Sequence, residues 1–115
     1  YRPVVQALRL PTDDPARAGA VAAALMEAAE VPFAITELAA EVAQLAADCA
    51  QRAGRHPVGD AATASVLAAA ACRAAAMLVS LNLEGVADDR PGQAAQLAEQ
   101  AAIVSQHALG RAHGE

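Results

Sequence analysis

The abundance of alanine is the feature that most restricts what this chain can fold into, since alanine accounts for 35 of the 115 residues. Trp is absent, and Phe and Tyr each occur once. Alanine has the highest helix propensity because it loses no side-chain entropy in a helix, whereas strands favour β-branched and aromatic residues. An all-β fold is therefore excluded, and the high apolar content argues against intrinsic disorder.

Proline and aspartate mark the helix boundaries in the first half of the chain. Residues 4–10 read as the last turns of a helix that Pro11 closes. The segment Thr12-Asp13-Asp14-Pro15 predicts a new helix over about 15–30, because Pro is tolerated at the first helical position and Asp caps free N–H groups. Pro32 lacks an N–H and disfavours helical geometry before it, so a kink or short break is expected there.

Two further helices follow in the second half. Gly54 ends the helix that follows Pro32, and Asp60 is the expected N-cap of a helix over about 61–82. Asp88-Asp89-Arg90-Pro91 repeats the pattern of a helix start and predicts a last helix over about 91–109.

Regular spacing of apolar residues predicts which helix faces are buried. The helix after Pro32 has apolar residues three and four positions apart, at Ile35, Leu38, Val42, Leu45 and Cys49. The last helix has a similar stripe at Ala94, Leu97, Ala101, Val104 and Ala108. Both cysteines, Cys49 and Cys72, lie on apolar faces and are expected to be small buried side chains of an intracellular protein.

The helix over 61–82 is apolar on nearly every side, which places it at the centre of a bundle. The segment is long enough to cross a membrane, but most of it is alanine, and Arg73 near its middle costs about 2.5–3.5 kcal/mol on insertion. We therefore expect no membrane span. The prediction is one all-α domain over residues 1–115, an antiparallel helical bundle with one central Ala-rich helix. Because the core has few large side chains, we expect the remaining apolar surface to be buried by a second subunit or by helices upstream of this sequence, and a second subunit is the simpler explanation.

Charge and residue spacing exclude several classes of function. Lys+Arg is 8 and Asp+Glu is 13, which gives a net charge of −5. The cations are single, scattered arginines, unlike the basic stripe of a nucleic-acid-binding protein. The His and Cys residues show no metal-ligand spacing, so no metal is expected. A secretory signal is also absent, and a cytoplasmic protein is expected.

Three polar residues interrupt the central helix and are the candidates for a site. Asp60 at its start and Asn82 at its end are either helix caps or functional groups. Arg73, near the middle, is too costly to bury unpaired. It therefore pairs with a carboxylate, reaches solvent, or faces an anionic ligand.

The order of several short motifs resembles the cyclodeaminase domain of formiminotransferase-cyclodeaminase and the related bacterial methenyltetrahydrofolate cyclohydrolases. The resemblance covers essentially the whole chain. It rests on Val4-Val5, Leu10-Pro11, Arg17, Ala28-Ala29-Glu30-Val31-Pro32, Glu41-Val42, Gly54, Gly59-Asp60-Ala61, Arg73, Leu81-Asn82-Leu83 and Asp88.

This resemblance implies an all-helical, homodimeric domain that forms or opens 5,10-methenyltetrahydrofolate, with a folate as substrate and no further cofactor. When the family's residues are matched to this sequence one by one, the resemblance implies that Asp60 is catalytic and transfers a proton. Asn82, Arg73 and Arg17 are implied as substrate-binding residues, the arginines pairing with folate carboxylates. The resemblance also implies that the sequence is the C-terminal part of a longer domain, whose upstream helices carry a Gly-rich loop.

Several positions depart from the pattern of the family. Gly59 replaces a Ser, Leu78 and Ser80 replace an Asn and an Arg, and Arg55 replaces an Asn. These are positions that the chemistry would use. An alternative therefore stays open: a catalytically silent homologue that binds a small anionic ligand or acts only as a helical dimerisation module.

Overall fold

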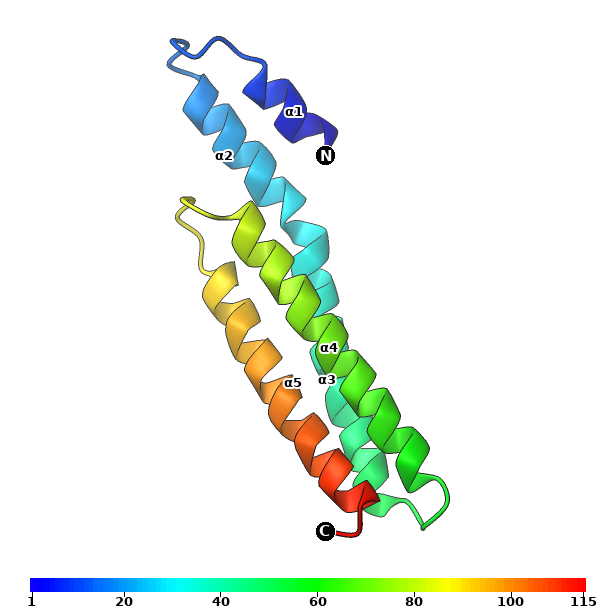
Figure 1. Ribbon diagram of the computed structural model, residues 1–115. Coiled ribbons are helices and arrows are strands. Elements are labelled where there is room, and N and C mark those ends of the chain that lie inside the picture. Colours follow the sequence, from blue (N-terminus) through cyan, green and yellow to red (C-terminus); the bar gives the residue numbers. More distant parts are fainter.

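Five helices account for most of the computed structural model, which describes residues 1–115 (Figure 1). They are α1 (Arg2–Leu8), α2 (Arg17–Ala28), α3 (Glu30–Arg52), α4 (Val58–Asn82) and α5 (Arg90–Ala112). No strand is present, which confirms the all-α prediction. The molecule is long and narrow, with extents of 64 × 21 × 15 Å.

The three long helices α3, α4 and α5 lie side by side, each antiparallel to the next, and form the bundle (Figure 1). Helix α2 continues the direction of α3 beyond the end of the bundle, and α1 folds back along α2. Since α1 contacts no other helix, the α1–α2 hairpin projects from the bundle instead of joining its core.

Local sequence signals explain most of the helix ends. The carboxylates of Asp14 and Asp88 each accept a hydrogen bond from the backbone N–H two residues later, at 2.8 and 2.9 Å. These contacts form tight turns before α2 and α5. The predicted N-cap at Asp60 is wrong, because α4 already begins at Val58, with Pro57 before it. Asp60 instead lies in the first turn, where its negative charge interacts favourably with the positive end of the helix dipole.

A single non-helical residue, Ala29, separates α2 from α3, three positions before Pro32. This confirms the break that Pro32 predicts. Pro32 cannot donate the hydrogen bond that the carbonyl of Ala28 would otherwise accept, so the helix is interrupted at that carbonyl. The two helices nevertheless stay nearly collinear (Figure 1).

The core of the bundle consists almost entirely of small residues. Helix α3 buries Thr36, Ala39, Ala43, Ala47 and Ala50. They face small residues of α4 such as Ser65, Ala69 and Cys72, and of α5 such as Ala101 and Ala108. Small side chains allow helix backbones to approach closely, but each contact buries little apolar area.

The predicted core stripe of α3 is wrong. Ile35, Leu38, Val42, Leu45 and Cys49 are all exposed. Four of the five buried residues lie one position further along the chain than the predicted ones, which corresponds to about 100° around the helix. The alanine stripe is buried because it fits the equally small residues of α4, and the larger side chains are turned outward.

The other helix faces follow the prediction more closely. On α5, Ala94, Ala101 and Ala108 of the predicted stripe are buried. Cys72 is buried as predicted, its Sγ lies 3.3 Å from the carbonyl oxygen of Thr36, and burial raises the pKa of its thiol. Helix α4 contacts both other helices of the bundle but is not covered on every side, since Leu67 is 66% exposed.

By length and apolar composition alone, two helical segments could cross a membrane, Arg17–Arg52 and Val58–Asn82. The central helix of a water-soluble bundle meets the same criteria, so this observation does not assign the protein to a membrane.

Candidate functional site

The four candidate residues lie far apart within one chain. Asp60 and Asn82 stand at opposite ends of α4, 22 positions apart, which is about 33 Å along a helix. Arg73 lies between them, about 20 Å from Asp60 by the same rise per residue. Arg17 is on the projecting α2. One chain therefore does not bring these groups around a single small molecule.

Asp60 and Arg73 are both exposed on α4 and make no side-chain hydrogen bond or ion pair within the chain. Of the alternatives for Arg73, pairing with a carboxylate is thus excluded within one chain. Arg73 lies outside the grooves described below, and its guanidinium reaches solvent.

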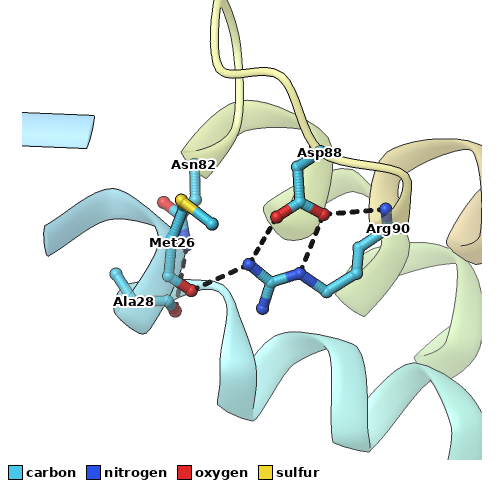
Figure 2. A network of polar contacts seen from close by, with 5 residues as sticks. All are labelled: Met26, Ala28, Asn82, Asp88 and Arg90. Carbon is cyan, nitrogen blue, oxygen red and sulfur yellow. Dashed lines mark hydrogen bonds and ion pairs between the residues drawn. The ribbon is translucent and has the colours of Figure 1, made fainter. Parts of the chain in front are cut away.

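Asn82 is half-buried and has a structural partner. Its side-chain Nδ2 donates to the carbonyl oxygen of Ala28 at 3.3 Å. This carbonyl is the one that Pro32, four residues later, cannot pair with. Asn82 therefore satisfies an acceptor that the proline leaves free, and it ties the end of α4 to the α2–α3 junction (Figure 2).

Asp88 and Arg90 form the only ion pair of the chain, next to Asn82 (Figure 2). The Arg90 Nη2 and Nε donate to the two carboxylate oxygens of Asp88 at 2.8 and 2.9 Å, and the same Nη2 donates to the carbonyl oxygen of Met26 at 3.0 Å. Hydrogen bonds from the side chain and backbone of Arg90 lower the pKa of Asp88 from 3.8 to about 2. This network connects the start of α5 to the end of α2.

The sequence indicated only a helix start at Asp88-Asp89-Arg90-Pro91. Asp88 and Arg90 are only two positions apart, and this short spacing was the signal in the sequence for their ion pair. The contact of Arg90 with Met26 could not be read from the sequence, because it depends on how α2 and α5 meet in space.

Arg17 connects the two helices of the α1–α2 hairpin by one hydrogen bond. Its Nη2 donates to the carbonyl oxygen of Leu8 at 3.4 Å, while its buried Nε has no acceptor. A buried donor without an acceptor is unfavourable, so this position of the guanidinium carries a small energetic cost.

The four main cavities of the molecule are open grooves, and none of the four candidate residues lines them. The first, of about 290 Å³, runs between α3 and α5, and its polar lining is Glu37, Glu41, Gln44 and Gln100. Another is entirely apolar and lies between α3 and α4, with Ile35, Leu38 and Ala71 among its residues. No group of three or more His, Cys, Asp or Glu side chains is placed to hold a metal ion.

Comparison with known protein families confirms the resemblance seen in the motifs. Residues 1–102 match the family described as formiminotransferase-cyclodeaminase. The match extends from α1 into α5 and includes all four candidate residues. No curated protein and no solved structure matches the chain significantly.

Proposed function

The chain belongs to the formiminotransferase-cyclodeaminase family, and from this membership we propose that it acts in folate one-carbon metabolism. The proposed reaction forms or opens 5,10-methenyltetrahydrofolate, either as a cyclodeaminase or as a cyclohydrolase. The observation that carries the proposal is the match over residues 1–102, which spans nearly the whole helical fold.

In this proposal, Asp60 transfers a proton at the bridge between the two folate nitrogens, and its carboxylate is exposed and unpaired. Arg73 and Arg17 pair with the carboxylates of the folate, and the guanidinium of Arg73 is exposed and free to do so. Asn82 orients the substrate. Because these groups are separated in one chain, the proposed site also needs surface from outside it, from a second copy or from a further part of the protein.

We further propose a homodimer that works in the cytoplasm, takes a folate as its substrate and needs no additional cofactor. The scattered arginines and the net charge of −5 support the absence of a nucleic-acid partner. Arg73, near the middle of the longest apolar helix, supports a soluble assembly over a membrane span.

A second candidate function is a catalytically silent homologue that binds a small anion or acts only as a helical dimerisation module. Two observations favour it. Arg73 is exposed and lines no groove, and Asn82 already has a structural role as the donor to Ala28.

The deciding experiment follows the absorbance of 5,10-methenyltetrahydrofolate with and without the full-length protein, expressed from its own start codon. Catalysed interconversion that Asp60→Asn abolishes would support the enzyme. The matched control is Asp13→Asn, which removes an exposed carboxylate near the α1–α2 turn and should leave the rate unchanged. A folded protein without turnover would favour the silent homologue instead.

A further inference from the structure

The loop between α3 and α4 and the last residues of α5 lie at the same end of the bundle (Figure 1). Basic side chains gather at this end, although they are scattered along the sequence. Three of the eight arginines and all three histidines lie there: Arg52, Arg55, Arg111, His56, His107 and His113. The whole chain carries a net charge of −5, so this end differs in composition from the rest of the molecule.

A groove of about 370 Å³ opens between these segments and is called the basic groove below. Its lining comes from the α3–α4 loop, the start of α4 and the end of α5: Arg55, Val58, Arg111, Ala112, His113 and Gly114. Pockets for small molecules begin at about 300 Å³, so the groove suits a small ligand. Two guanidinium groups and one imidazole ring line it, and no carboxylate does.

Arg111 is held toward the α3–α4 loop by a hydrogen bond. Its Nη2 donates to the carbonyl oxygen of Ala53 at 3.5 Å. Ala53 precedes Arg55 by two positions, and the guanidinium groups of Arg55 and Arg111 line the same groove. Neither arginine forms an ion pair. Two positive charges therefore share a small space, and an anion between them would relieve their repulsion.

Helix dipoles account for only part of this arrangement. Helices α3 and α5 both end here, and the negative end of a helix favours a cation in its last turn. Arg52 and Arg111 lie in such last turns. Arg55 lies outside every helix, and its side chain makes no hydrogen bond within the chain. The dipoles thus leave Arg55 unexplained, and its guanidinium is free to bind a ligand.

The acidic residues of the same end do not neutralise the groove. Asp48 accepts a hydrogen bond from Gln44 at 2.9 Å along α3, and Asp60 lies in the first turn of α4. Glu115 lines the neighbouring groove together with Arg111 but forms no ion pair with it. The positive charges of the basic groove therefore have no carboxylate partner within the chain.

We propose that the basic groove binds a small soluble ligand that carries a phosphate group. A phosphate has a charge of about −1.5 to −2 at pH 7 and three oxygens that accept hydrogen bonds. Two guanidinium groups offer paired donors to such oxygens, and the ring N–H of His113 offers another. A carboxylate has one charge and two oxygens, so it would leave more of these donors unpaired.

The phosphate site rests on none of the residues of the proposed folate site. Arg111 and His113 lie beyond residues 1–102, the part of the chain that matches the family. Arg55 stands at a position where the sequence departs from the family's pattern. The combination of these three side chains is therefore a feature of this chain and does not follow from its family.

Titration of the full chain with inorganic phosphate, followed by ¹H–¹⁵N NMR at constant ionic strength, tests the site. The amide signals of residues 55–58 and 111–114 should shift and saturate, and those around Arg73 should not. Arg55→Gln should weaken phosphate binding about tenfold, because it removes a charge-assisted hydrogen-bond donor. The matched control is Arg9→Gln, which removes an equally exposed arginine beside α1 and should leave the affinity unchanged.

Two further variants separate the contribution of the fork-shaped donor from charge and from folding. Arg55→Lys keeps the positive charge but loses the planar pair of donors, so it should retain only part of the affinity. Arg111→Gln should also weaken binding about tenfold. Its helical circular dichroism should persist, because Arg111 contributes one long hydrogen bond to the fold.

Three results would overturn the phosphate site. The first is the absence of a saturable shift, and the second is a shift of equal size around Arg73, which would show unspecific attraction of charge. The third is binding to phosphatidylcholine vesicles that contain phosphatidic acid, without binding to inorganic phosphate, which would show contact with a membrane surface. A chain that binds phosphate without folate turnover would refute only the proposed function, and turnover with an empty groove would refute only the phosphate site.

Discussion

Replacing Asn82 by alanine tests the link between Pro32 and the end of α4. The change removes the Nδ2 donor that lies 3.3 Å from the carbonyl oxygen of Ala28. Pro32 has no N–H to offer in its place. The lost bond is neutral, long and only half-buried, so the expected cost is about 1 kcal/mol in the free energy of unfolding. For a domain of this size, that lowers the Tm by about 4 °C.

The informative measurement is a double-mutant cycle with Pro32→Ala, followed by thermal and urea unfolding at one fixed protein concentration. Pro32→Ala restores a backbone N–H four residues after Ala28, so the carbonyl no longer depends on the side chain of Asn82. Asn82→Ala should therefore cost about 1 kcal/mol in the wild-type background and nearly nothing in the Pro32→Ala background.

An equal cost in both backgrounds would refute the reasoning, because it would show that Asn82 stabilises the fold by some contact unrelated to Pro32. A loss of folate affinity without any loss of stability would instead favour the substrate-binding role of Asn82.

Three further outcomes are expected. The pKa of Asp88 falls from 3.8 to about 2 on folding, so its contribution to stability is complete above pH 3.8 and is lost as the pH falls through about 2; acid titration by circular dichroism should show that Asp88→Asn removes this dependence. Ala43→Leu should cost about 1–3 kcal/mol by overpacking a fully buried position, whereas Ala102→Leu on the exposed side of α5 should change the free energy of unfolding by less than about 0.5 kcal/mol; chemical denaturation compares the two, and equal effects would contradict the described core. Cys49 should react with a thiol reagent in the native protein and Cys72 only after unfolding; native reactivity of both would show that Cys72 is not buried.

Much of the helical architecture follows from short segments of sequence. Pro15, Pro32, Gly54 and Pro91 mark boundaries that the structure reproduces to within a few residues. Each proline restricts φ and lacks an N–H, whereas glycine disfavours the helix because its backbone is so flexible. The error at Asp60 has a local cause as well, because α4 starts directly after Pro57 and Asp60 is already its third residue.

The separation of the candidate residues was also contained in the sequence. Asp60 and Asn82 stand at the two ends of one predicted helix, and the rise per residue sets their distance whatever the helix packs against. What the sequence did not reveal was the partner of Asn82, since the carbonyl of Ala28 comes from a segment 54 residues away.

The buried face of α3 depends on tertiary structure. Its sequence carries two adjacent apolar stripes, a small one through Ala43 and a large one through Leu38, and hydrophobicity alone favours the larger. The small stripe is buried because α4 presents Ser65 and Cys72 at the same heights, and small residues on both sides allow the two helices to pack closely.

The sequence by itself thus determined the helices, their approximate limits and the family, because helix propensity, proline geometry and motif order are properties of neighbouring residues. Only the tertiary structure decided which stripe is buried, which polar groups meet and which face stays open. Those outcomes depend on the match in size and hydrogen bonding between segments distant in the chain, as Ala28 and Asn82 illustrate.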